Sequence, residues 1–482
     1  MNLSRLVHPD LLKGNILKSL VLFTLPLLAS SVFQQLYNAV DTMIVGHYLG
    51  EQSLAAIGSC TSLNDLLIGF GVGFGGGMGI VSARVFGSGN REKLKNVSAT
   101  ALVISLSISA LLIVLTRFFL RPILQALGTP SEILDESLSY ISTITMFAVV
   151  LLLYNLFSAL LRSIGNSFMP LVFLIVSSLL NIVLDILFIT RFSLGVKGAA
   201  IATVIAQAVS ATLCLIYILK TTKMLVPSAK HFKIERKILK DLLAQGLSMA
   251  CMGSLVNSGT VVLQSAINSF GTLIIAGHIS ARKIFSMCTI PIFTLGMASS
   301  TFVSQNYGAG QYDRIRRGIK CAIAITIVWA LLLSAIMPFA SRAIISGLSG
   351  SSDETVVSYG ATYITFAVPF FLVLGALIIL RNSLQGMQCK ILPLISSVIE
   401  LLGKIVFTLL IIPHFGKWGL IMCEPLIWCS WCGPGNRSWR RSDRRRACRR
   451  ERLPASRPSC HLVCHPASPL RAHRRARRAP SF

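Results

Sequence analysis

Seven polar side chains interrupt the apolar stretches in the first half of this 482-residue chain. Two of them are carboxylates, and no Lys or Arg lies within one helical turn of either. A charge at the centre of a membrane helix costs about 3 kcal/mol, so such residues are functional candidates by default. The seven are Gln34, Tyr37, Asn38, Asp41, Asn181, Asp185 and Thr203.

The spacing of these residues places them on common helix faces. The four from Gln34 to Asp41 are three or four apart, and Asn181 and Asp185 are four apart. Carboxylates, an amide and a hydroxyl offer oxygen ligands, which suit Na⁺ or a proton and not a transition metal. The sequence therefore predicts a cation-coupling site formed by Asp41, Asn181, Asp185 and Thr203.

Two neighbouring carboxylates repel each other unless they share a proton or a cation. Release of that ion can drive the exchange of a second solute. A structural alternative remains, in which Asp41 caps a helix end and Asp185 pairs with a base on another helix.

Glu400 and Lys404 are a second charged pair, four residues apart in a later apolar run. An acid and a base at this spacing lie on one helix face and attract each other. We predict an internal ion pair with a structural or gating role.

The apolar runs that must position these groups dominate the composition. Hydrophobic residues make up 53% of the chain and charged residues 13%, with a mean hydropathy of +0.70. A run of about twenty apolar residues spans the hydrocarbon core as a helix, because lipid cannot satisfy backbone hydrogen bonds. We predict an all-α integral membrane protein whose first span is uncleaved. Eleven spans are expected, near 17–40, 53–80, 96–117, 138–161, 168–190, 198–219, 241–268, 273–302, 321–340, 357–380 and 391–413.

The net charge of +27 does not indicate a nucleic-acid partner, because the basic residues are unevenly distributed along the chain. Residues 429–482 hold 15 Arg, one Asp and one Glu. If the N-terminus is inside, the inside loops hold 21 Lys and Arg, including Arg381, against eight outside. The positive-inside rule therefore predicts a multi-pass protein of the cytoplasmic membrane with a cytoplasmic N-terminus.

The chain repeats itself with an offset of 221 residues, which brings Gly50 onto Gly271 and Gly87 onto Gly308. Six spans precede the midpoint, so both halves insert with the same orientation and are related by a pseudo-two-fold axis along the membrane normal. We expect two six-helix lobes, at 1–219 and 241–428, joined by a basic cytoplasmic linker at 220–240. Because Asp41 aligns with Val262 and Asp185 with Val406, the predicted ion site is confined to the first lobe.

The repeat also predicts a twelfth helix near 419–440. The sequence of this helix begins as expected at Gly419, but after Trp428 it changes abruptly to an Arg-rich composition. Our hypothesis is a frameshift near codon 429. An intact reading frame, found by resequencing, would contradict it. The alternative is a genuine basic tail that binds anionic lipid or nucleic acid.

Several motifs together resemble those of the multidrug and toxic compound extrusion (MATE) family, of the bacterial and archaeal type. The resemblance covers about residues 15–428 and rests on the order and duplication of the motifs. They are Val40-Asp41-Thr42, Ala83-Arg84-x2-Gly87-x-Gly89, Leu161-Arg162-x2-Gly165, Asn181-x3-Asp185, Gln305-Asn306-Tyr307-Gly308-Ala309-Gly310 and Gln385-Gly386.

The resemblance implies two six-helix lobes around a cavity that opens alternately to each side. It implies a transporter, not an enzyme, that exports organic cations and amphipathic drugs in exchange for H⁺ or Na⁺ without a cofactor, and we expect a monomer. Residues matching Asp41, Asn181, Asp185 and Thr203 form the first-lobe cation site of similar family members. Those matching Gln34, Tyr37 and Asn38 line its cavity.

Two alternatives remain open. One is a lipid-linked oligosaccharide flippase of the same superfamily, for which Arg282, Lys283 and Lys404 are the basic residues available to meet phosphate. The other is an inactive product of the disrupted reading frame.

Overall fold

The structure is a computed structural model that describes residues 9–430. Within this range the chain is helical, with no β-strand. The α-helices are α2 (Ile16–Gly87), α3 (Arg91–Ala126), α4 (Ser131–Met146), α5 (Ala148–Ser163), α6 (Phe168–Ile186), α7 (Gly195–Thr221), α8 (Arg236–Asn268), α9 (Thr272–Gly308), α10 (Tyr312–Ser349), α11 (Glu354–Ala367), α12 (Phe371–Gly386), α13 (Ile391–Val406) and α14 (Ile412–Phe415). A last helix covers residues 417–430.

The predicted membrane spans are confirmed. Among residues 9–430, ten helices are long and apolar enough to cross a membrane, and the bent pair α4 and α5 makes an eleventh. That pair bends by 48° at Phe147, where neither proline nor glycine marks the break. All eleven lie where the apolar runs predicted them.

The 221-residue repeat recurs in the backbone. Gly50 and Gly271 have φ values of 81° and 84°, and both break the chain between consecutive spans. Glycine adopts this positive φ without the steric cost that a Cβ would add. The fifth span of each half also ends in a π-helical turn, η1 (Leu187–Arg191) in the first half and η4 (Phe407–Ile411) in the second. The two halves therefore share local geometry as well as sequence landmarks.

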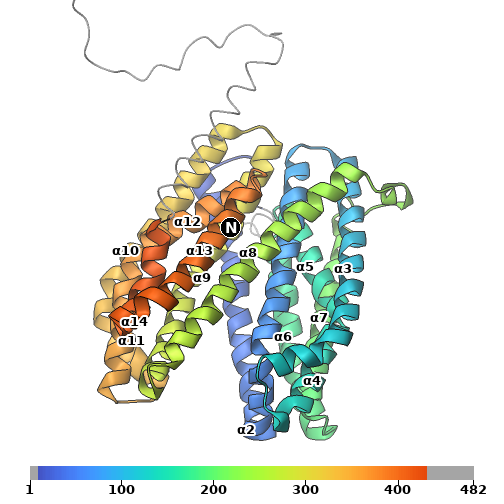
Figure 1. The fold of residues 1–482 in the computed structure, drawn as a ribbon. Helices are drawn as coiled ribbons and strands as arrows, with labels where there is room; N and C mark the ends of the chain where they lie inside the picture. Colours follow the sequence, from blue (N-terminus) through green and yellow to red (C-terminus); the bar gives the residue numbers. More distant parts are fainter. Residues whose placement is uncertain (1–8, 431–482) are drawn as a thin grey trace, which may run out of the picture. The chain divides into compact units, whose positions relative to one another are not determined.

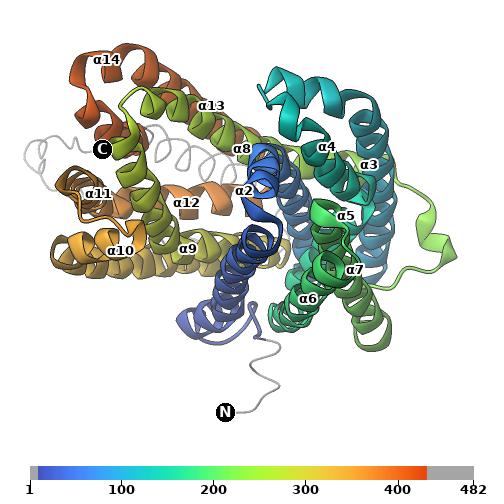
Figure 2. The same cartoon turned by 90° about the horizontal axis from the view of Figure 1, so that it is seen from below.

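The helices form two groups. Helices α2–α7 lie on one side and α9–α14 on the other, while α8 runs between them (Figures 1 and 2). Each group buries its own apolar core, around Phe74 and Leu156 in the first half and around Ile292 and Phe371 in the second. Helix α2 packs against both α8 and α9, so the first span pair connects the groups.

The boundaries of the basic linker differ from the expected 220–240. Helix α7 ends at Thr221 and α8 begins at Arg236, so the linker is shorter, with one 3₁₀ turn, η2 (Ala229–Phe232). The final helix begins at residue 417 and continues to residue 430. The disruption was expected to begin near residue 429, and all of it beyond residue 430 lies outside the described residues.

Candidate cation-coupling site and a second charged cluster

The structure brings the two predicted acids of the first half together. Asp41 lies on α2 and Asp185 lies on α6, one residue before that helix ends. The two carboxyl groups are close enough to interact electrostatically, which favours a proton or a cation between them. The Asp185 side chain is 0% exposed, and Asp41 Oδ1 is buried without a hydrogen-bond partner. The pair thus has an unsatisfied oxygen available to a proton or a cation.

Asn181 and Thr203 complete this site. With its amide nitrogen facing the acid, Asn181 donates to Asp185 Oδ2 at 2.9 Å and accepts from the Thr203 backbone N–H at 3.2 Å. The Thr203 hydroxyl lies 3.4 Å from the Tyr37 hydroxyl. All four predicted coupling residues are therefore in one place, and Tyr37 adjoins them. A π-helical turn begins two residues after Asp185, as is frequent at functional sites.

Gln34 and Asn38 lie farther along the same face of α2. The Gln34 amide donates to Asn38 Oδ1 at 3.3 Å, and Asn38 is exposed. These two amides hydrogen-bond to each other and not to the acids.

Tyr140 is a neighbour of the site that the sequence did not reveal. This buried residue of α4 lies within electrostatic range of Asp41 and Tyr37. Tyr140 belongs to a polar stripe of α4 that also carries Glu136 and Thr143, and its nearness to the site depends on how α4 packs against α2 and α7.

The second half contains a larger charged cluster than the predicted pair. Lys404 Nζ lies 3.7 Å from Glu400 and 3.4 Å from Glu424. Arg381 contacts Glu400 at 3.1 Å, and Arg282 contacts Glu424 at 2.7 Å. We name Arg282, Arg381, Glu400, Lys404 and Glu424 the second-lobe charge cluster. Within the cluster, three cations and two anions alternate from one contact to the next.

This cluster corrects one sequence-based expectation and adds to another. The positive-inside count places Arg381 in a loop, but it lies inside α12 and is 4% exposed. Glu424 adds a residue to the predicted pair, and it stands 221 residues after Thr203, at the same place in the repeat. The second half has Val262 and Val406 at the positions of the two acids, and its paired charges lie on α9, α12, α13 and the final helix.

Repeated glycines hold the two halves together at one end of their helices. A Cβ added to Gly87 of α2 would overlap the Gln305 carbonyl of α9, and one added to Gly308 would overlap the Arg84 carbonyl. Ser304 Oγ donates to the Ile80 carbonyl at 2.5 Å beside this contact. The sequence motif that marked the duplication is therefore the place where the helices of the two halves approach most closely.

Two repeated groups of membrane-length helices, with two acids inside one group, are typical of a transporter. A family model described as MatE matches residues 26–187 and again 249–410. The chain belongs to this family, the MATE transporters.

Curated relatives span most of the chain. The chain is 27% identical to the probable multidrug resistance protein YoeA of Bacillus subtilis over 412 residues, which cover 84% of this chain and 89% of that protein. It is 23% identical to the multidrug export protein MepA of Staphylococcus aureus over 421 residues, which cover 86% and 92%.

Solved structures share the fold. An outward-facing multidrug resistance MATE transporter of the MOP superfamily superposes with a TM-score of 0.81 at 23% identity, covering 87% of this chain and 94% of that one. A MOP superfamily transporter from Pyrococcus furiosus gives 0.80 at 22% identity, covering 89% and 97%. That protein is described as having a binding pocket of reverse polarity that suggests a different function.

Proposed function

We propose that this chain is an antiporter that exports amphipathic organic cations in exchange for H⁺ or Na⁺. The observation that carries the proposal is the pairing of the buried Asp185 with the half-buried Asp41, in which one buried Asp41 oxygen has no partner. Two neighbouring acids repel each other when both are ionised, and a proton or a cation between them relieves that repulsion. Loading and release of that ion supplies the coupling step.

The proposed site can hold either ion. A proton would bind between the two carboxyl groups. Na⁺ would bind Asp41 and Asp185 together with the oxygens of Asn181 and Thr203, a ligand set of the kind that hard cations prefer. Gln34, Tyr37 and Asn38 would line the adjoining cavity for the substrate.

We further propose the cytoplasmic membrane as the location, with the N-terminus inside, since the loops on that side carry most of the Lys and Arg. In this orientation the contact at Gly87 and Gly308 closes the cytoplasmic side. Export then requires this contact to open and re-form in each cycle. The chain is proposed to act as a monomer.

Efflux of a fluorescent organic cation from proteoliposomes tests this function. An imposed pH gradient and an imposed Na⁺ gradient, applied separately, identify the coupling ion. Asp41→Asn and Asp185→Asn should abolish gradient-driven efflux, whereas Asp135→Asn, an exposed acid outside the site, should leave it intact. Full efflux in both site variants would refute the proposal, and absence of efflux in the unmodified chain would favour an inactive product.

The flippase alternative needs unpaired basic groups to meet a lipid-linked phosphate. Arg282 and Lys404 are each paired with a buried acid. Lys283 alone of the three candidates is exposed without an ion pair in the described range. The charge arrangement therefore favours export of organic cations.

A further inference from the structure

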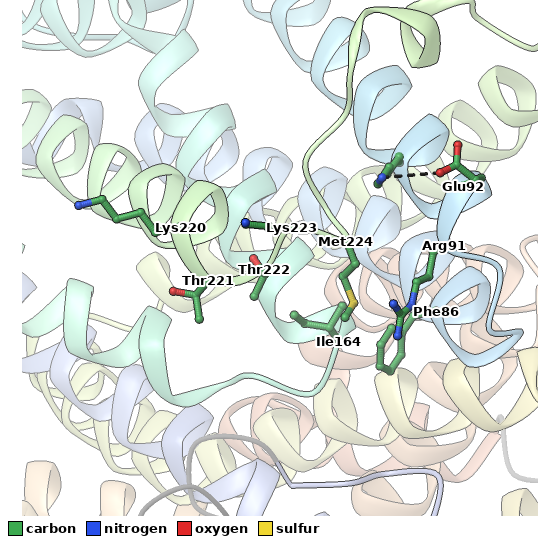
Figure 3. Close-up of a pocket in the computed structure, with 10 residues that line it drawn as sticks. Phe86, Arg91, Glu92, Ile164, Lys220, Thr221, Thr222, Lys223 and Met224 are labelled. Carbon is green, nitrogen blue, oxygen red and sulfur yellow. Dashed lines mark ion pairs between the residues drawn. The ribbon is translucent and has the colours of Figure 1, made fainter.

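A basic pocket lies where three candidate membrane spans of the first half end. Helix α2 ends at Gly87, α3 begins at Arg91 and α7 ends at Thr221. The pocket between them has a volume of about 600 Å³. Its lining residues are Phe86, Arg91, Glu92, Lys95, Ile164, Lys220, Thr221, Thr222, Lys223 and Met224. Figure 3 shows Phe86 and Arg91 on one side and the residues of the α7 end on the other, with Ile164 and Met224 between them and the Lys220 side chain extending away from Arg91.

The charges in this pocket do not cancel. Glu92 is its one acid, and that carboxylate is already engaged by Lys95 at 3.6 Å, by Lys230 at 3.0 Å and by His231 at 3.0 Å. Arg91, Lys220 and Lys223 line the same pocket and pair with no acid among residues 9–430. Three positive charges are therefore left for a ligand.

The position and chemistry of the pocket indicate what that ligand is. Three cations from two segments, the start of α3 and the end of α7, suit the oxygens of a phosphate group, which accepts strong charge-assisted hydrogen bonds. Phe86, Ile164 and Met224 add a partly buried apolar wall. A pocket at the ends of membrane helices lies at the depth of lipid head groups, and basic pockets at this level bind anionic lipids.

We propose that the pocket binds the phosphate head group of one anionic phospholipid, with Arg91, Lys220 and Lys223 as its ligands. The glycerol and the first acyl carbons then lie against Phe86 and Met224. Such a lipid would link the end of α7 to the start of α3. The site is separate from Asp41 and Asp185, so its occupancy is measurable without transport.

Native mass spectrometry of the full chain in detergent, titrated with phosphatidylglycerol or phosphatidylcholine, tests the proposal. The first phosphatidylglycerol should bind about tenfold or more tightly than phosphatidylcholine. A triple variant, Arg91→Gln with Lys220→Gln and Lys223→Gln, should lose this preference. The matched control carries Lys233→Gln, Lys237→Gln and Lys240→Gln, which remove three exposed charges from the same region outside the pocket. It should keep the preference.

Three results would overturn the proposal. One is an absence of preference in the unmodified chain. Another is an equal loss in both triple variants, which would mean that the surface attracts lipid through its overall charge. The third is displacement of the lipid by inorganic phosphate at an equal concentration, which would make a soluble phosphate the ligand. Thermal unfolding of each variant shows whether a lost preference reflects a lost fold.

Discussion

At the scale of single residues, the pair of Asp41 and Asp185 lowers the stability of the fold but is required for the proposed activity. Their proximity is unfavourable whenever both are ionised, and a shared proton or a bound cation removes that cost. Asn keeps the size of Asp and can donate a hydrogen bond to the remaining acid. We expect Asp185→Asn to abolish transport while leaving the thermal unfolding temperature unchanged or raised.

Thermal unfolding in detergent and efflux in proteoliposomes, measured on the same preparation, check this expectation. Loss of both stability and efflux would instead indicate that Asp185 has a structural role. Asp135→Asn provides the comparison for a surface acid, since Asp135 contacts only the exposed Arg121 at 3.3 Å.

In the second-lobe charge cluster, by contrast, loss of an acid is expected to lower stability. Glu424 neutralises two cations, so Glu424→Gln leaves Arg282 and the 2%-exposed Lys404 without that acid. Breaking a buried ion pair from one side costs about 3–5 kcal/mol. We expect a large fall in the unfolding temperature. Glu354→Gln, which breaks the exposed pair with Arg342, should change it little.

A double variant tests whether the cluster acts as one unit. Glu424→Gln combined with Lys404→Met removes one charge of each sign. Its effect on stability should be smaller than the sum of the two single effects, because the groups are in direct contact. Additive effects would show that the two residues are independent.

The spacing of residues along the sequence predicts contacts within one helix but not contacts between helices. Asn181 and Asp185 share one helix, so an interval of four already places them together. Arg381 meets Glu400 across two helices, and Arg282 meets Glu424 likewise. Such pairings depend on how the helices pack, so the spacing of residues within one segment cannot predict them.

At the scale of elements, the helix at residues 417–430 is held by aromatic packing. Trp428 is 4% exposed and stacks on Phe285 with ring centroids 6.0 Å apart. Replacement of a buried aromatic side chain by alanine costs about 3–5 kcal/mol. We expect Trp428→Ala to lower the unfolding temperature strongly. Trp418→Ala, at a 44%-exposed position of the same helix, should have a small effect, and equal effects would show that the helix is not anchored at Trp428.

The positions of spans were predictable from sequence, and their irregularities were not. A run of twenty apolar residues can satisfy lipid only as a helix, so all eleven spans followed from composition. The bend at Phe147 and the π-helical turns carry no proline signal within them. The apolar residues at these positions do not differ in kind from those of the regular helix around them, so composition alone could not predict them.

At the scale of the whole described molecule, the contact of α2 with α9 sets how closely the two halves can approach each other. An added methyl group at Gly87 would overlap the Gln305 carbonyl, so Gly87→Ala should force the two helices apart. We expect an increased distance between spin labels at the exposed positions Lys93 and Asp313, measured by electron paramagnetic resonance.

Gly76→Ala is the control for this experiment, because a Cβ there meets only the flexible end of Met249 at 3.5 Å. It should leave the label distance unchanged. If Gly87→Ala also leaves the distance unchanged, the glycine contact does not limit the approach of the halves.

The contact at Gly87 and Gly308 is symmetric between the two halves. Gly87 meets Gln305, and Gly308 meets Arg84, where 305 and 308 are 84 and 87 each shifted by 221. A surface in which one position meets the copy of a second position, while the second position meets the copy of the first, is isologous, as in a two-fold homodimer. The chain therefore contains, within a single polypeptide, the interface of a two-subunit protein. Each half keeps the matching surface, while the charged residues in the helices behind it have become different.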